Sequence, residues 1–553
     1  MCSLSLKMAL NIPGLIAVIV FYLIILVTGI WASKKSKKEE RKCIGARSEV
    51  SMVGGRNIGI LVGVFTMTAT NVGGGFILGT AEATYAHGLL WALGPLIYIL
   101  GAFIGGIFFA KPMREKKYTT MIDPFQIKYG DIISCILVVS SVLSDIFWTG
   151  AILAGLGGMM KVILGIESYQ SIIISAAIAI CYTLLGGLYS VAYTDIIQLI
   201  FIIISLWICI PFLILSPAVT DIVYTATHAL HQPPWIGFLD LTNVWNWLDT
   251  VISNSFAMVC FQTFYQRVLA SASSKVAQIT CFLSGGFCFF LGIPSLLIGA
   301  MAASTNWNMT SYGLPTPLDR GEPGNIMPIM LEHLCPTYVS IIGIGAVSAA
   351  VMSSVDSALL SSSSIFTCNI YKKILRKKAS DIEVMWVIRI TILIFGVTGM
   401  GLGMAASSIY GLWLLSVEIS FAVNFAPLVC VLFVPSSNSY GVIVGILVEV
   451  VLTLGAGLSA LHIPPFIKYP GCKVVNGVYV QVFPYKTLSM VLSLGIIVAV
   501  SHLSSFLFNR GLLPETWDIY NIKRKPEVTV RNTTSEEVAE EMVLNDTNPT
   551  TWS

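Results

Sequence analysis

Apolar runs of about 20 residues recur along almost the whole chain, and short polar loops separate them. One such run crosses the hydrocarbon core of a bilayer as a helix, because roughly 20 helical residues span about 30 Å. We therefore predict an all-α polytopic membrane protein with about 13 transmembrane helices. The predicted spans are 13–32, 58–80, 89–110, 132–163, 170–188, 196–215, 247–265, 278–302, 338–370, 384–405, 410–434, 441–460 and 487–508.

Composition also favours a membrane protein over a soluble one. Of the 553 residues, 55% are hydrophobic and 11% are charged, whereas soluble domains carry about 25% charged residues. The formal net charge of +3 indicates no nucleic-acid partner. The 12 cysteines form no CxxC pair and lie mostly in apolar runs, which favours packing over redox or metal chemistry. A disulfide between Cys335 and Cys472, both in predicted outer loops, stays open.

Clusters of Lys and Arg predict the orientation of the chain. They follow the first, third and ninth spans, at 34–47, 111–117 and 372–378. Positively charged loops stay in the cytoplasm, so we expect the N-terminus outside and the C-terminus in the cytoplasm. The expected location is the plasma membrane.

Two longer loops, 216–245 and 305–325, fall outside the cell in this topology. The second loop contains a sequon that makes Asn308 the expected glycosylation site. The chain then divides into a transmembrane domain over 1–515 and a polar, acidic tail over 516–553. We expect that tail to be cytoplasmic and disordered.

The second span differs from a plain lipid-facing helix. It reads Thr66-Met67-Thr68-Ala69-Thr70-Asn71-Val72-Gly73-Gly74-Gly75, which places three glycines and several hydroxyls in mid-membrane. Glycines weaken a helix, and non-helical backbone at this depth is tolerated only when buried in protein or lining a cavity. An interrupted helix frees carbonyls to bind a cation and marks the binding site of many secondary transporters. Close helix packing through small residues is the alternative.

The ninth span contains the other polar motif. Ala350, Ser353 and Ser354 share one helix face, with Asp356 adjacent to it. An ionised carboxylate at the bilayer centre costs about 2.5–3.5 kcal/mol, so it needs a partner. A small hard cation fits, because it takes hydroxyl, carbonyl and carboxylate oxygens, and no Lys or Arg lies inside these spans except near their ends. The alternative is a hydroxyl-rich packing face with a protonated Asp356.

Together these motifs resemble the sodium/solute symporter family, which has an inverted-repeat core of five plus five helices. Further stretches resemble its high-affinity choline transporter branch, and the likeness covers about residues 13–515. Those stretches are 79–83, 108–114, 186–195, 265–268 and 345–350. The resemblance implies core repeats at about 58–215 and 247–434.

The resemblance also implies a sodium site between the second and ninth spans. By motif position, its ligands are the carbonyls of Ala69, Val72 and Ala350, the hydroxyls of Ser353 and Ser354, and the carboxylate of Asp356. Sodium is thus the expected coupling ion. No other cofactor is expected, and a chloride dependence stays open.

The choline branch holds its quaternary ammonium in a cage of aromatic side chains, because such a cation is bound through cation–π attraction. At the matching positions this chain has Tyr98, Trp148 and Phe261, and it has Asn71 where the branch has Trp. Asn at that position resembles the sugar-type members of the family. Asp145 lies one turn before Trp148 and can add negative charge near a cationic substrate.

The seventh span shows another departure from the choline branch. The branch has Gly-Gly-x-Pro just before the cage Trp, whereas this chain reads Ala257-Met258-Val259-Cys260-Phe261. None of these residues is a helix breaker. The sequence therefore gives no local reason for a second broken helix here.

We expect a sodium-coupled symporter for choline or a related quaternary ammonium. The alternatives are a different solute, or a non-transporting sodium-binding sensor. An enzyme is not expected, because the sequence has no metal triad, no nucleophile–base pair and no nucleotide loop. The implied partners are a small molecule, sodium and the lipid bilayer, and the oligomeric state is not indicated.

Overall fold

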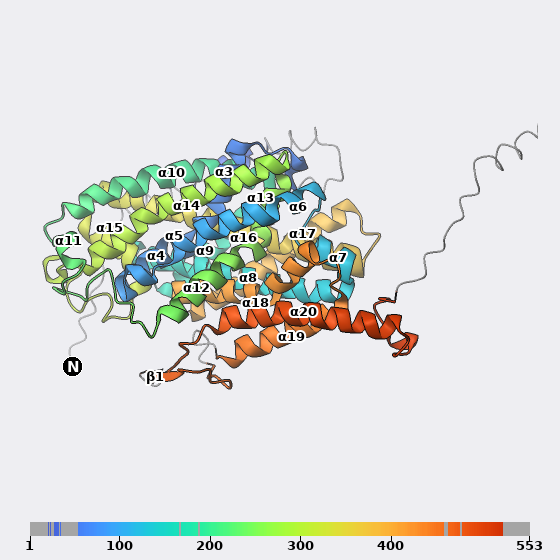
Figure 1. Cartoon of the computed structure of the whole chain (residues 1–553). Coiled ribbons are helices and arrows are strands. Elements are labelled where there is room, and N and C mark those ends of the chain that lie inside the picture. The colour runs from blue at the N-terminus through green and yellow to red at the C-terminus, as the bar shows by residue number, and fades with distance from the viewer. Residues whose placement is uncertain are drawn as a thin grey trace, which may run out of the picture. The chain divides into compact units, whose positions relative to one another are not determined.

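The computed structural model describes residues 53–523, except 165–166, 186–187, 407, 458–462 and 476–477, together with Val20, Leu23, Val27–Ala32 and Lys34. The described residues are almost all helical (Figure 1). Most of the predicted first span, the basic cluster that follows it and the tail beyond residue 523 lie outside the described residues. The chain forms two compact units, Met1–His502 and Leu503–Ser553.

The predicted all-α fold is confirmed within the described residues. The helices longer than ten residues are α3 (Ile60–Asn71), α4 (Gly74–His87), α5 (Gly94–Ile104), α8 (Asp131–Leu164), α9 (Ser168–Leu185), α10 (Leu188–Ile214), α12 (Val244–Ala257), α14 (Ser274–Ala303), α16 (Thr337–Ile365), α17 (Asp381–Ala405), α18 (Ile409–Phe433), α19 (Ser439–Gly455) and α20 (Tyr485–Asn509). The strands form one antiparallel hairpin, β1 (Lys473–Val475) and β2 (Val478–Val480).

Eight helices in the described part are long and apolar enough to cross a membrane, or nine with the bent pair α3 and α4. Helices α9 and α19 include shorter apolar stretches. Large apolar side chains such as Ile107, Ile204 and Leu447 are exposed on the helices, as expected for surfaces that face lipid. The chain is a multi-pass membrane protein, while the total of about 13 spans stays a prediction.

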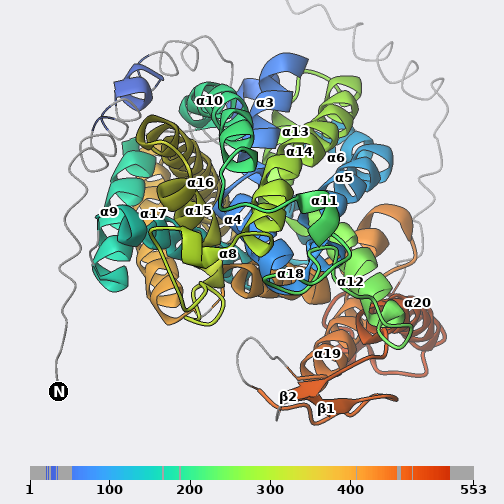
Figure 2. The ribbon, with the colours of Figure 1, turned by 90° about the vertical axis from the view of Figure 1, so that its left-hand side faces the viewer.

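Helix α16 lies in the interior of the first unit. It packs against α8 and α10 (Figure 2), and every residue from Gly343 to Ile365 is buried. A helix buried on all sides faces protein rather than lipid. The hydroxyl and carboxyl groups of the ninth predicted span are thus enclosed by other helices.

Two helical segments of the first unit are interrupted in the middle. The pair α3 and α4 bends by 51° at Val72 and Gly73. The other segment runs from α12 through a 3-10 turn, η4 (Met258–Cys260), to an extended Phe261 with φ −93° and ψ 133°, and then into α13 (Gln262–Ala270). The second interruption occurs although the sequence there has no helix breaker.

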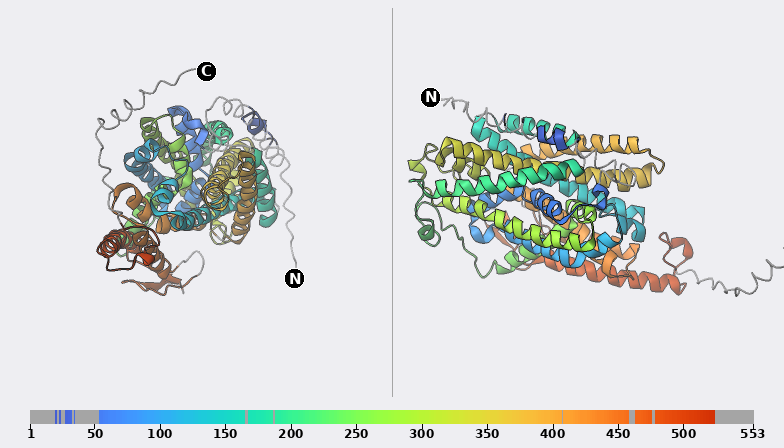
Figure 3. Two further views of the ribbon diagram at one scale, coloured as in Figure 1. Left: turned by 90° about the vertical axis from the view of Figure 1, so that its right-hand side faces the viewer. Right: turned by 90° about the horizontal axis from the view of Figure 1, so that it is seen from above.

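The long helices of the first unit run roughly alongside one another (Figure 3). Helix α14 packs against α3, α4 and α5, while α18 packs against α8 and α12. These neighbours hold both interruptions inside the bundle. Their broken backbones are therefore shielded from lipid, which is the condition for non-helical structure at this depth.

Candidate sodium and solute sites

The break between α3 and α4 lies directly against α16. A Cβ atom placed on Gly73 would come within 1.9 Å of the Ser354 hydroxyl oxygen and 3.7 Å of the Ala350 carbonyl oxygen. Only glycine permits this approach, because any other side chain would collide with Ser354. The glycines of the second span therefore allow both the interruption of the helix and its close contact with α16.

Two hydroxyls of α16 bind the last turn of α3. Ser354 Oγ donates to the Thr70 carbonyl over 2.9 Å, and Ser357 Oγ lies 3.1 Å from Thr70 Oγ1. Ala69 and Val72 flank this contact and are fully buried. The structure thus brings the two predicted motifs together. The assignment of Ala69, Val72, Ala350, Ser353, Ser354 and Asp356 as sodium ligands stays a prediction.

Ser353 bonds to a third helix that the sequence reasoning did not include in the site. Its hydroxyl donates to Asp195 Oδ1 of α10 over 2.7 Å. Thr66 of α3 donates to the other carboxylate oxygen over 2.5 Å. Asp195 therefore joins α3, α10 and α16 through a single buried carboxylate.

Arg267 of α13 supplies a positive charge beside these carboxylates. One of its guanidinium nitrogens, Nη2, donates to Ser357 Oγ over 2.6 Å and lies 3.7 Å from Asp195 Oδ2. Both partners of the ion pair are almost completely buried. Each of these buried charges needs the other, because removing one partner of a buried ion pair is strongly destabilising.

Asp356 lies in the same buried region. Its carboxylate is fully enclosed, and neither oxygen makes a hydrogen bond of ordinary geometry within the described residues. Asp195 and Asp356 together carry two acidic groups against the single guanidinium of Arg267. A buried acid without a partner is costly, so this region can accept one further cation or a proton.

Aromatic side chains gather near both helix interruptions. Tyr98 stacks on Trp413 with ring centroids 6.0 Å apart, and Trp148 meets Phe261 edge-to-face at 5.8 Å. All four rings are buried. Trp413 of α18 was not singled out from the sequence, but here it lies against Tyr98 and next to the Cβ position of Gly75.

Asn71 and Asp145 occupy different surroundings. Asn71 ends α3 and lies within reach of the Cys288 thiol on α14. Asp145 lies on α8 one turn before Trp148, and its carboxylate accepts a hydrogen bond from Ser361 Oγ over 3.2 Å. That bond directs Asp145 toward α16, two turns beyond Ser354. A role for Asp145 toward a cationic substrate stays a prediction.

Three residues of these sites, Asp195, Arg267 and Trp413, were missed as site residues. Asp195 and Arg267 carried a signal, since each is a lone charge within or at the end of an apolar run. Their pairing joins α10 to α13, which are distant in sequence. Trp413 had no such signal, because a Trp in an apolar run is most often a packing residue.

The sodium:solute symporter family profile matches residues 52–449. The chain belongs to the sodium:solute symporter family. High affinity choline transporter 1 of Homo sapiens is 48% identical over 517 residues, 93% of this chain and 89% of that protein. High-affinity choline transporter 1 of Drosophila melanogaster is 41% identical over 92% of this chain and 81% of that protein.

More distant members of the sodium:solute symporter family are also similar. High-affinity proline transporter PutP of Bacillus subtilis is 24% identical over 74% of this chain. The solved structure of a Na⁺-coupled sialic acid symporter, substrate-bound and outward-open, has a TM-score of 0.70 at 17% identity. It covers 89% of this chain and 98% of its own, so the two share a fold. The members of this family are sodium-coupled transporters and not enzymes.

Proposed function

We propose that this chain is a sodium-coupled symporter for choline or a related quaternary ammonium. The observation that carries the proposal is the set of four buried rings, Tyr98–Trp413 and Trp148–Phe261, next to the two helix interruptions. A quaternary ammonium donates no strong hydrogen bond, so aromatic faces are its natural partners. The relatives named as choline transporters, which match this chain over most of its length, support the same solute.

We propose that one sodium ion binds between the break after α3 and the middle of α16. Its ligands are the carbonyls of Ala69, Val72 and Ala350 and the hydroxyls of Ser353 and Ser354. Support comes from the contact of Gly73 with Ser354 and Ala350, which places oxygens of both helices in one buried region. The carboxylate of Asp356 completes the proposed set of ligands and adds negative charge to this region.

Sodium coupling supplies enough energy to concentrate a solute. One positive charge moving inward across 100 mV releases about 2.3 kcal/mol, which corresponds to roughly a 50-fold gradient. Sodium binding stabilises the state open to the outside, and the solute then closes the outer gate. A chloride dependence belongs to this proposal as a condition to be tested in the same assay.

The topology in this proposal follows the basic loops. Residues 1–515 form the transmembrane domain of a plasma-membrane protein, with the N-terminus outside and the tail 516–553 in the cytoplasm. Asn308 carries the glycan, which is supported by its exposed side chain in the turn η5 (Trp307–Met309). The core repeats are 58–215 and 247–434.

The deciding experiment is uptake of labelled choline by proteoliposomes that contain the purified protein. We expect uptake with external sodium and none when potassium replaces it. Betaine, glucose and proline serve as competitors in the same assay. Sodium-dependent uptake of labelled glucose or proline, with no sodium-dependent uptake of labelled choline, would overturn choline as the solute.

A second candidate function is a sodium-binding protein that does not transport. The observation in its favour is Asn71, which offers no aromatic face where a cage is expected. Sodium-dependent protection of the protein against thermal unfolding, with no uptake of any solute, would support this candidate. Sodium-dependent uptake of one solute would exclude it.

A further inference from the structure

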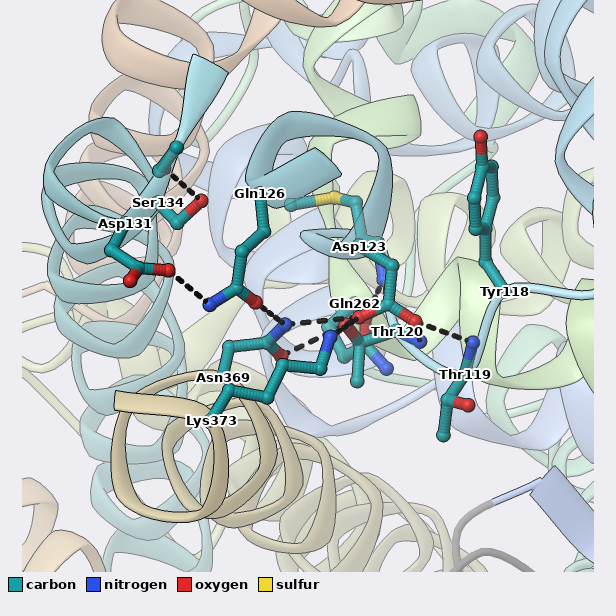
Figure 4. Close-up of polar contacts among 12 residues, drawn as sticks. Tyr118, Thr119, Thr120, Asp123, Gln126, Asp131, Ser134, Gln262, Asn369 and Lys373 are labelled. Atoms are coloured by element: carbon teal, nitrogen blue, oxygen red, sulfur yellow. Dashed lines mark hydrogen bonds and ion pairs between the residues drawn. The ribbon is translucent and has the colours of Figure 1, made fainter. Parts of the chain in front are cut away.

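A loop at the basic end of the bundle is organised around Asp123 (Figure 4). The basic end is defined here by Lys111–Lys117 and Lys372–Lys378. Asp123 begins α7 (Asp123–Tyr129), and its Oδ2 accepts the backbone N–H groups of Thr119 and Thr120 over 2.7 and 3.1 Å. The Thr120 hydroxyl lies 2.8 Å from Asp123 Oδ1. These bonds fold Thr119–Asp123 into a tight loop.

The same carboxylate reaches across to the extension of α16. Asn369 Nδ2 and Lys373 Nζ both donate to Asp123 Oδ1, over 3.0 and 2.7 Å. Both donors lie on η7 (Phe366–Leu375), a π-helical segment that directly continues α16. A π-helical segment of this kind often lies at a functional site. Asp123 therefore holds the end of the helix that carries Ser353 and Ser354.

The loop also binds the second interrupted segment. The backbone N–H of Met121 donates to Gln262 Oε1 over 2.7 Å. Gln262 is the first residue of α13 and follows Phe261 directly. One short loop thus contacts both the residue after the break at Phe261 and the continuation of α16 (Figure 4).

We propose that the Thr119–Asp123 loop is a latch that keeps the basic end of the transporter closed, and that Asp123, Lys373 and Gln262 are its positioning residues. The proposal rests on the proposed transport function. Release of solute and sodium at the basic end requires α13 and the extension of α16 to separate. While Asp123 holds Lys373 and Met121 holds Gln262, the two segments remain tied to one loop.

Asp123 stays negatively charged, so protonation does not release the latch. Burial alone would raise the pKa of this carboxyl, but the ammonium of Lys373 and the hydrogen bonds from Thr119 and Thr120 hold it below its usual range. The group is therefore ionised throughout the cytoplasmic pH range. Protonation of Asp123 is therefore not what opens the latch.

The test compares Lys373→Gln with Lys377→Gln. Both changes remove one positive charge from the same basic end, but Lys377 is exposed and has no side-chain contact among those described for this segment. We expect Lys373→Gln to favour the state open at the basic end. The external choline and sodium concentrations for half-maximal uptake should then rise about threefold to tenfold, with Lys377→Gln at the wild-type values.

A second measurement reports opening without transport. Cys368 lies on η7 and is 7% exposed, so its thiol should react slowly while the latch is closed. Inside-out vesicles are treated with a membrane-impermeant maleimide, and labelling of the peptide that contains Cys368 is quantified by mass spectrometry. Lys373→Gln and Asp123→Asn should label several times faster than the wild type, and Lys373→Arg should label at the wild-type rate.

Equal labelling of Lys373→Gln, Asp123→Asn and Lys377→Gln would overturn the latch. If Asp123→Asn fails to fold, the Lys373 variants still decide the result. The labelling assay needs no solute, so it remains valid if wild-type protein takes up no choline. Absence of uptake would therefore refute the proposed function alone.

Discussion

At the residue scale, the polar groups of the sodium region act in pairs that join different helices. Ser353 bonds to Asp195 on α10, while its neighbour Ser354 bonds to the Thr70 carbonyl on α3. Two adjacent hydroxyls on α16 thus bind it to two different helices, α10 and α3. Asp356 differs from both, because neither oxygen of its carboxylate makes a hydrogen bond of ordinary geometry within the described residues.

Asp356→Ala should raise the sodium concentration that supports half-maximal uptake. A unit charge within about 10 Å of a bound cation attracts it by about 1.5 kcal/mol or more at an effective dielectric constant of about 20, so we expect an increase of roughly tenfold or more. The matched control is Ser363→Ala on the same helix, since that hydroxyl is also buried and unpartnered among the described residues. An unchanged sodium dependence in uptake assays of Asp356→Ala would count against the predicted site.

Asn71→Trp should strengthen choline binding. Asn71 ends α3 at the break, and by the resemblance it stands where the choline branch has a Trp of the aromatic cage. Cation–π attraction in a desolvated site contributes about 2 kcal/mol, so the half-maximal choline concentration should fall roughly 30-fold. Asn71→Leu adds apolar bulk without a π face, and an equal gain in this control would refute the cage.

At the element scale, the two interrupted segments differ in how far sequence predicts them. The break between α3 and α4 was expected from Gly73–Gly75. The break at Phe261 was not, because Ala257–Phe261 contains neither Gly nor Pro. Its cause is tertiary: Ser420 of α18 donates to the Cys260 carbonyl over 3.1 Å, and so satisfies a backbone group at the break.

Gly73→Ala tests whether the first break must contact α16. The added Cβ would lie 1.9 Å from Ser354 Oγ, so α4 and α16 would have to separate. We expect sodium-dependent uptake to fall about fivefold or more, given the steric cost of overpacking of about 1–3 kcal/mol. Gly286→Ala on α14 is the control, because nothing lies within 4 Å of its added Cβ, and it should transport normally.

The Thr119–Asp123 latch should not respond to pH in the physiological range. The pKa of Asp123 is held below its usual range, so its stabilising bonds are fully present above about pH 4 and are lost only below the lowered pKa. Lys373 is the facing cation and Tyr118 the nearby phenol. The ratio of uptake by wild type to that by Asp123→Asn should stay constant between internal pH 6 and 8. A ratio that changes severalfold over this pH range would contradict a lowered pKa for Asp123.

At the scale of the whole molecule, sequence predicts the membrane-spanning architecture better than the site. The apolar runs correspond to helices throughout the described residues, because length and hydrophobicity alone determine whether a segment can cross a bilayer. Asp195 and Arg267 were missed because their roles arise from contacts among α10, α13 and α16. Trp413 was missed because its role arises from the contact of α18 with Tyr98 of α5. Such contacts depend on how the whole bundle is assembled.

The helix α20 shows how an additional element is attached to that bundle. Asp249 of α12 accepts the backbone N–H groups of Lys486 and Thr487, over 3.1 and 2.7 Å, and so caps the start of α20. The ammonium of Lys486 pairs with Glu418 of α18, and the two side chains are 9% and 21% exposed. The start of α20 is therefore fixed to α12 and to α18, and α18 carries Trp413 of the proposed solute site.

Lys486→Met should lower the stability of the whole protein because it leaves Glu418 largely buried without its cation. Removing one partner of a buried ion pair costs about 3–5 kcal/mol, and the partial exposure of Glu418 reduces the expected loss to about 2–3 kcal/mol. Thermal unfolding in detergent should show a Tm several degrees lower.

Two control variants separate the ion pair from other effects. The double variant Glu418→Gln with Lys486→Met should recover part of the lost stability. Lys523→Met breaks an exposed ion pair with Glu515 and should change Tm little. Equal Tm values for the single and double variants would show that the cap from Asp249, and not the ion pair, attaches α20.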